Sequence, residues 1–125
     1  MKELSTQHAT ILLVDDNVDV RTLAKEYFDD LGYSVDTAGS AEEALSLFDP
    51  RAHDLVLTDN SMPGMTGEKL AQIIKERSPS TLVVMFTGNP PADRSCVDAI
   101  VPKPASLLEV IEAMEALLDK REKLG

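Results

Sequence analysis

Aspartate side chains follow two of the short apolar segments in this sequence. Asp15 and Asp16 come directly after residues 9–14, and Asp59 comes directly after residues 55–58. Short apolar runs of this kind are typical of buried parallel strands, whose carboxyl ends meet at one edge of a sheet. Carboxylates gathered at that edge would repel one another unless a cation balanced them. Because Mg²⁺ prefers oxygen ligands and takes few carboxylates, the pattern predicts a magnesium site.

A threonine and a lysine take corresponding positions farther along the chain. Thr87 follows the apolar segment 82–86, and Lys103 comes shortly after residues 99–101. The lysine would supply a fixed positive charge, and the threonine would supply a hydroxyl donor. A carboxylate such as that of Asp59 can attack a phosphoryl group while a metal ion and a lysine neutralise charge on the transferring oxygens. These residue types therefore suggest phosphoryl transfer onto an aspartate.

Each of these residues also has an ordinary explanation. An Asp-Asp pair after a strand usually begins a loop or caps a helix, and a lysine between prolines is usually a surface charge. A threonine at the end of a strand is usually there because it favours β structure. The pattern is specific because all five residues fall at the carboxyl ends of predicted strands, in this chain order.

Strand and helix patterns alternate along the sequence. Short apolar segments predict five strands, over residues 9–14, 33–38, 55–58, 82–86 and 99–101. Helical spacing of apolar residues predicts helices over about 20–31, 41–48, from about 66 onward and over 107–118. Capping-box sequences, Ser40–Glu43 and Ser106–Glu109, open two of these helices. The alternation predicts an α/β fold, with an open parallel sheet and helices on both faces.

The stretch between the fourth and fifth strands is short for a helical crossover. A parallel crossover normally needs about a dozen residues or more, and loops of about two to six residues flank its helix. Gly88, Pro90 and Pro91 disfavour a helix at the start of this stretch. We therefore expect the fourth helix to be very short, or to be replaced by an irregular and mobile loop.

Composition bounds the classes of partner and the compartment. The 125 residues carry 12 lysines and arginines against 22 aspartates and glutamates, a net charge of −10. Such acidity argues against direct binding of nucleic acid or of an anionic membrane surface. The one cysteine, Cys96, cannot form an internal disulfide, and we see neither a secretory signal nor an apolar run of membrane-spanning length. We therefore expect a cytoplasmic protein.

The sequence contains no repeat and no linker that would mark a second domain. We expect one folded domain over residues 9–120, with flexible segments at 1–8 and 121–125. The histidines His8 and His53 form no metal-ligand pattern with other residues near them in the sequence, and we expect both at the surface. Without a P-loop or a GxGxxG pattern, nucleotide hydrolysis and dinucleotide chemistry are not expected.

Over residues 9–120 the sequence resembles the receiver domain of bacterial response regulators. Four stretches carry the resemblance: Leu12-Leu13-Val14-Asp15-Asp16, residues 54–67, Phe86-Thr87-Gly88 and Lys103-Pro104. The second stretch is the most specific, with Met-Pro three and four residues after Asp59 and a glycine eight residues after it. The resemblance implies a flavodoxin-like, doubly wound sheet of five parallel strands in the order 2-1-3-4-5. It also implies a phosphorylation-controlled signalling switch of a two-component or phosphorelay system.

The resemblance assigns a role to each candidate residue. Asp59 would be the phosphoacceptor and would bind Mg²⁺ directly together with Asp16 and the backbone carbonyl of Ser61, while Asp15 would act on the metal mainly through water. Thr87 would be the switch hydroxyl, and Lys103 would contact the phosphoryl oxygens. The donor would be the phosphohistidine of a histidine kinase or of a histidine phosphotransfer protein. Such a receiver catalyses only its own phosphorylation and dephosphorylation and is not an enzyme with a separate substrate.

This sequence departs from the family pattern at two places, both of which concern how the signal is read out. Ile100 stands where the family usually has its aromatic switch residue, three positions before the lysine. The stretch from Thr87 to Lys103 is also several residues shorter than is usual in the family.

Two other functions fit parts of the pattern. A haloacid-dehalogenase-like phosphatase also uses an aspartate nucleophile and Mg²⁺, and its family pattern after the first strand is Asp-x-Asp. Here the corresponding residues are Asp15 and Asn17, and an amide cannot donate the proton that the second aspartate donates. A phosphate-independent pseudo-receiver, acting only as a binding module, would be expected to lose Asp59, Lys103 or one of the acidic pair, and all of them are present.

Overall fold

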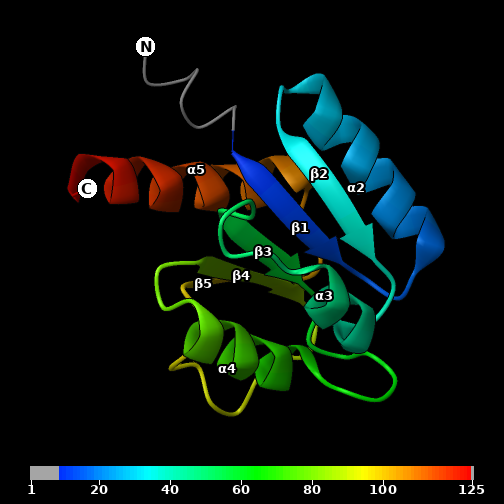
Figure 1. Ribbon diagram of the computed structural model, residues 1–125. Coiled ribbons are helices and arrows are strands. Elements are labelled where there is room, and N and C mark those ends of the chain that lie inside the picture. Colours follow the sequence, from blue (N-terminus) through cyan, green and yellow to red (C-terminus); the bar gives the residue numbers. More distant parts are fainter. Residues whose placement is uncertain (1–8, 125) are drawn as a thin grey trace.

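The computed structural model describes residues 9–124 and contains one five-stranded, wholly parallel sheet in this range. The strand order is β2-β1-β3-β4-β5, as predicted. The strands are β1 (Thr10–Val14), β2 (Ser34–Ala38), β3 (Leu55–Thr58), β4 (Leu82–Thr87) and β5 (Ala99–Pro102). The helices are α2 (Val18–Asp30), α3 (Ala41–Leu47), α4 (Gly67–Arg77) and α5 (Leu107–Leu124). Figure 1 shows the twisted sheet at the centre of the molecule.

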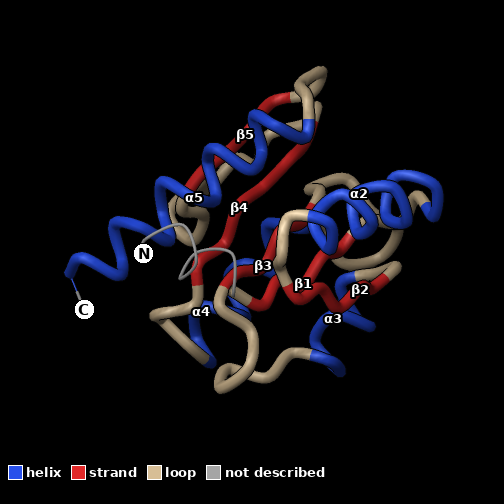
Figure 2. Tube along the Cα trace, turned by 90° about the horizontal axis from the view of Figure 1, so that it is seen from above, coloured by secondary structure: helices blue, strands red, loops and turns tan. Residues whose placement is uncertain are grey.

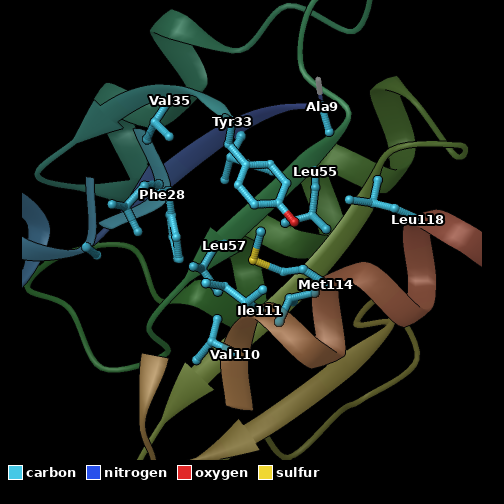
Figure 3. Close-up of a cluster of buried hydrophobic side chains, with 14 of the residues drawn as sticks. Ala9, Phe28, Tyr33, Val35, Leu55, Leu57, Val110, Ile111, Met114 and Leu118 are labelled. Atoms are coloured by element: carbon cyan, nitrogen blue, oxygen red, sulfur yellow. The ribbon is translucent and has the colours of Figure 1, made fainter. Parts of the chain in front are cut away.

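Helices cover both faces of the sheet. Helices α2 and α5 lie on one face, and α3 and α4 lie on the other (Figure 2). Each pair of helices closes its own cluster of buried apolar side chains. Figure 3 shows the cluster under α2 and α5, where Phe28 and Met114 are fully buried. The central strands contribute to both clusters, which explains why they read in the sequence as continuous apolar runs.

Side-chain caps set where the helices begin. Asn17 starts α2 because its side-chain oxygen accepts hydrogen bonds from two backbone N–H groups of the first turn. Thr66 caps α4 in the same way by accepting from the N–H of Lys69 at 3.2 Å. The predicted capping box before α5 is confirmed, because Ser106 and Glu109 each accept a hydrogen bond from the other's backbone N–H.

The chain between β4 and β5 contains no regular helix in residues 88–98, all of which the structure describes. The prediction that the fourth helix is very short or replaced by an irregular loop is therefore confirmed, and the expected mobility of this loop stays a prediction. The far end of this loop is fixed by Asp98, whose carboxylate accepts from the N–H of Val83 at 2.8 Å and from Lys75 Nζ at 2.7 Å. The segment is thus irregular and still tied to its neighbours at its end.

Two expectations from the sequence need correction. His53 is buried, with 4% of its surface exposed, because its ring stacks on Phe48 and both ring nitrogens have partners. Helix α5 continues to Leu124, so the expected domain end at residue 120 falls inside it. Arg121 holds this last part of the helix by donating to the backbone and side chain of Asp54. The expected flexible segment 1–8, with His8, lies outside the described residues. No helix in residues 9–124 is long and apolar enough to cross a membrane.

Candidate functional site

The three aspartates meet at the carboxyl edge of the sheet. Asp15 and Asp16 follow β1 and Asp59 follows β3, and these strands are neighbours in register, with Val14 beside Thr58. One carboxylate oxygen from each aspartate lies within 4.8 Å of the other two. Three carboxylates this close form an all-oxygen donor set that fits a hard divalent cation such as Mg²⁺. The structure thus brings together the acidic residues that were expected to bind the metal.

The cluster is unequal in its exposure to solvent. Asp15 is 6% exposed, whereas Asp16 is exposed. Burial is the largest cause that raises the pKa of Asp15, and the charges of Asp59 and Asp16 raise it further. The N–H of Asn17 and the charge of Lys103 act in the opposite direction. The surroundings of Asp15 therefore disfavour its ionised form.

Lys103 provides the positive charge of the site. Its Nζ lies 3.2 Å from Asp59 Oδ2. Its backbone N–H donates to the carbonyl oxygen of Thr87 at 3.0 Å, which extends the pairing between β4 and β5 and places the backbone of Lys103 beside the end of β4. The other oxygen of Asp59, Oδ1, accepts the N–H of Ser61 at 3.2 Å. Asp59 is thus held from both sides.

Thr87 is fully buried at the end of β4, and its hydroxyl contacts the loop that follows. The hydroxyl accepts the N–H of Asn89 at 3.1 Å and lies 3.4 Å from the Asn89 carbonyl oxygen. Ile100 is partly buried and pairs in register with Met85 on β4. The switch roles of Thr87 and Ile100, like the metal-binding role of the Ser61 carbonyl, stay predictions.

Sequence reasoning missed a hydrogen-bond network that joins the loops after β3 and β4. The amide of Asn60 donates to the Asn89 carbonyl at 2.9 Å and accepts from the N–H of Glu68 at 2.9 Å. Asn89 in turn donates to Ser61 Oγ at 2.8 Å, and Glu68 accepts the N–H of Ala92 at 2.9 Å. The position of Asn60, directly after the acceptor, was the available signal, but its partners are far away in sequence.

Gly67 allows the loop after Asp59 to close. A Cβ atom at this position would lie 2.1 Å from the carbonyl oxygen of Asp59 and 2.9 Å from Cα of Asn60. Only a residue without a side chain leaves room for so close an approach between the first turn of α4 and the end of β3. The glycine eight residues after the acceptor is therefore explained by packing against the acceptor's own backbone.

Comparison with known proteins agrees with this geometry. Residues 11–115 match the family model described as the response regulator receiver domain. The chain is 30% identical over 118 residues to the transcriptional regulatory protein ResD of Bacillus subtilis, covering 90% of this chain and 49% of ResD. Two further curated relatives are much longer: the chain spans 19% of a putative transcriptional regulator of Haloferax volcanii, to which it is 38% identical, and 10% of the sensor kinase/phosphatase LuxN of Vibrio campbellii, to which it is 37% identical.

Solved structures give the same result. A CheY-like receiver domain protein from Methanospirillum hungatei superposes with a TM-score of 0.87 at 28% identity, covering 94% of this chain and 99% of that one. The response regulator TrrA of Thermotoga maritima is 32% identical, with a TM-score of 0.80 over 87% of this chain and 98% of its own. TrrA has been solved in complex with Mg²⁺-BeF and in complex with the histidine kinase ThkA.

Proposed function

The chain belongs to the response regulator receiver domains of two-component systems, and from this premise we propose that Asp59 is its phosphoacceptor. The donor is the phosphohistidine of a histidine kinase or of a histidine phosphotransfer protein, and Mg²⁺ binds beside Asp59 during the transfer. The observation that carries the proposal is the grouping of three carboxylates within 4.8 Å with Lys103 Nζ 3.2 Å from Asp59. No other group of three metal-ligating side chains this close occurs in the described residues.

The transfer makes one bond and breaks one bond. An oxygen of Asp59 attacks the phosphorus atom of the donor, and the bond from phosphorus to the imidazole nitrogen breaks, leaving its electron pair on the imidazole. Lys103 then shares its ammonium charge with the phosphoryl oxygens, which carry the developing negative charge. The N–H of Ser61 keeps the other carboxylate oxygen in position during the attack.

A divalent cation completes the charge balance of the site. Asp16, Asp59 and the Ser61 carbonyl would hold Mg²⁺, and Asp15 would assist mainly through water. Bound there, Mg²⁺ supplies positive charge that offsets the carboxylates and the transferring group. The support is the donor set of this chain, together with the Mg²⁺-BeF complex of TrrA.

Readout begins at Thr87. Its hydroxyl bonds to Asn89 in the present structure. We propose that this hydroxyl turns toward the phosphoryl group once Asp59 carries it, and that the loop at residues 88–98 responds. Because the chain spans half or less of its curated relatives, the output of the whole protein is a separate question from this switch.

The histidine donor is supported by the family and by the complex of TrrA with ThkA. In this scheme the chain is its own substrate, catalysing phosphorylation and dephosphorylation of Asp59 alone. A haloacid-dehalogenase-like phosphatase is not favoured, because Asn17 uses its side-chain oxygen to cap α2 and has no acidic proton to donate.

Intact-mass measurement tests the proposal. Wild-type protein incubated with Mg²⁺ and phosphoramidate should gain one phosphoryl group that hydroxylamine removes, and Asp59→Asn should gain none. Asp19→Asn removes an exposed carboxylate near the site but outside the cluster, so this control should react like the wild type. An equal gain of mass in Asp59→Asn would rule out Asp59 as the acceptor.

A further inference from the structure

An aromatic ring lies beside the active-site lysine. The ammonium of Lys103 stands 5.1 Å from the centroid of the Phe86 ring while it bonds Asp59 at 3.2 Å. A cation within about 6 Å of the face of an aromatic ring is attracted by the negative charge density of that face. Lys103 therefore has two partners. The carboxylate of Asp59 pairs with its charge, and the ring of Phe86 attracts the ammonium toward one side of the site.

The backbone explains why the two side chains meet. Phe86 on β4 pairs in register with Val101 on β5, and side chains two positions apart in a strand point to the same face. Lys103 follows Val101 by two positions, and its N–H bonds the carbonyl of Thr87, the residue after Phe86. The ring of Phe86 and the side chain of Lys103 therefore project from the same face of the sheet, from adjacent strand ends.

The Phe86 ring packs against the core, whereas the Lys103 side chain is partly exposed to solvent. Phe86 is partly buried and packs against the apolar cluster under α2 and α5. It also lines a small cavity together with Asp15 and Asp59. The Lys103 side chain is one-third exposed and has a long, flexible stem with many accessible rotamers. A fixed ring beside a flexible cation restricts the cation.

The position of the Lys103 ammonium matters because three carboxylates lie nearby. Without the ring, the ammonium could settle between Asp15, Asp16 and Asp59, where the metal is expected to bind. In the structure the ammonium bonds Asp59 and lies over the Phe86 ring. We propose that Phe86 is a positioning residue for phosphoryl transfer, which holds the Lys103 ammonium where it can meet the phosphoryl oxygens. This inference rests on the proposed role of Asp59 as acceptor.

The test combines rates with a spectroscopic signal. Phe86→Leu keeps an apolar side chain of similar size and removes the ring, whereas Phe86→Tyr keeps the ring. With phosphoramidate and saturating Mg²⁺, Phe86→Leu should lower the phosphorylation rate by about 2- to 5-fold, the range expected for a partly exposed cation–π contact. Phe86→Tyr should restore the wild-type rate. Tyr27→Leu, which removes an exposed ring on α2, should leave the rate unchanged.

Two further measurements separate positioning from a general structural role. The ε-methylene protons of Lys103 should resonate upfield of other lysines in the wild type and in Phe86→Tyr, because they lie over a ring, and should lose this shift in Phe86→Leu. In a Lys103→Met background, Phe86→Leu should cause no further loss of rate.

Each result has a defined meaning. An equal loss of rate in both lysine backgrounds, or an unchanged rate in Phe86→Leu, would overturn the role of Phe86. Normal phosphorylation of a wild type without the upfield shift would overturn it as well, while leaving the proposed function standing. A wild type that accepts no phosphoryl group but shows the shift would overturn the proposed function, and the positioning role with it, while the contact itself would be established.

Discussion

At Asp15 the charge of the proposed metal site meets the apolar interior. Burial raises the pKa of this carboxyl above its ordinary value of 3.8, and two neighbouring carboxylates raise it further. Ionised Asp15 is therefore less favourable in the folded protein than in the unfolded chain. The stability contribution of Asp15 in the metal-free protein is fully present below pH 3.8 and is lost as the pH rises through the raised pKa.

The first prediction follows from that sign. At pH 7 without Mg²⁺, Asp15→Asn should melt at a higher temperature than the wild type, because a poorly compensated charge is gone. Mg²⁺ at ten times its dissociation constant should stabilise the wild type by about 1.4 kcal/mol and should stabilise Asp15→Asn less. Thermal unfolding in EDTA and in Mg²⁺ measures both effects. A lower melting temperature for Asp15→Asn in EDTA would mean that the cluster is not strained, as would an absence of any response of the wild type to Mg²⁺.

The second prediction concerns the backbone at the acceptor. Gly67→Ala places a methyl group 2.1 Å from the Asp59 carbonyl oxygen, so the loop or the first turn of α4 must move. We expect a loss of about 1–3 kcal/mol in the free energy of unfolding, as for other overpacked sites, together with slower phosphorylation. Gly88→Ala is a matched control, because its nearest contact would be an ordinary 3.8 Å and its stability should change by less than about 0.5 kcal/mol. Equal stabilities of the two variants in urea unfolding would argue against the packing explanation.

At the scale of elements, His53 joins β2 to the segment before β3. Its Nδ1 accepts the N–H of Asp49 at 3.0 Å, its Nε2 bonds Asp36 Oδ2 at 2.8 Å, and its ring stacks on Phe48. The third prediction is that His53→Ala lowers the free energy of unfolding by roughly 2–3 kcal/mol, through lost packing and a lost hydrogen bond to the Asp49 N–H. Asp36→Ala should have a smaller effect, because the histidine keeps its ring contact and its bond to Asp49. Urea unfolding would contradict this account if the two substitutions had equal effects.

The loop between β4 and β5 is the element in which this chain departs most from a regular alternation of strand and helix. It is tied at one end through Asn89 and at the other through Asp98, with Glu68 binding its middle. The fourth prediction is that phosphorylation, or a beryllofluoride mimic, slows amide exchange in residues 88–97 more than elsewhere away from the site, because the loop orders around the phosphorylated Asp59. Hydrogen exchange with mass spectrometry resolves these peptides. Unchanged exchange there, with protection appearing along α4 instead, would assign the readout to another element.

How far sequence reasoning reaches depends on the distance between partners. Apolar runs and capping boxes are local, and they located every strand and the start of α5 closely. The shortness of the segment after Thr87 correctly indicated that a helix is missing. The burial of His53, by contrast, depends on Asp36, 17 positions earlier, and the Arg121 contact that extends α5 depends on Asp54, 67 positions earlier. Such pairings leave no periodic trace in the sequence.

For the site, the same division holds. Asp15, Asp16, Asp59, Thr87 and Lys103 were predicted as site residues because each comes at or just after the end of a predicted strand, and parallel topology brings strand ends together. The structure gathers the three aspartates, with Lys103 bonded to Asp59, while the functional roles of all five stay predictions. The ring of Phe86 was missed because an aromatic residue inside an apolar strand reads as core, and only the register between β4 and β5 brings it near Lys103. The link between Asn60 and Asn89 was missed for the same reason, since it joins two loops 29 residues apart.

At the scale of the whole molecule, the fold concentrates its chemistry at one edge. With a net charge of −10, acidic residues spread evenly over the surface would not mark out any one metal site. Instead the parallel sheet collects three carboxylates and one ammonium at its carboxyl end, between two apolar layers that hold the strands in register. The central claim is that this edge makes Asp59 the one residue that carries the phosphoryl group.

The most direct test identifies the residue that carries the phosphoryl group. Protein phosphorylated with phosphoramidate and Mg²⁺ is treated with borohydride, which reduces an aspartyl phosphate to homoserine, and is then digested and sequenced by mass spectrometry. The account predicts homoserine at position 59 and unmodified aspartate at positions 15 and 16. Homoserine at position 15 or 16 with unmodified Asp59, or a phosphoryl group that resists borohydride, would contradict it.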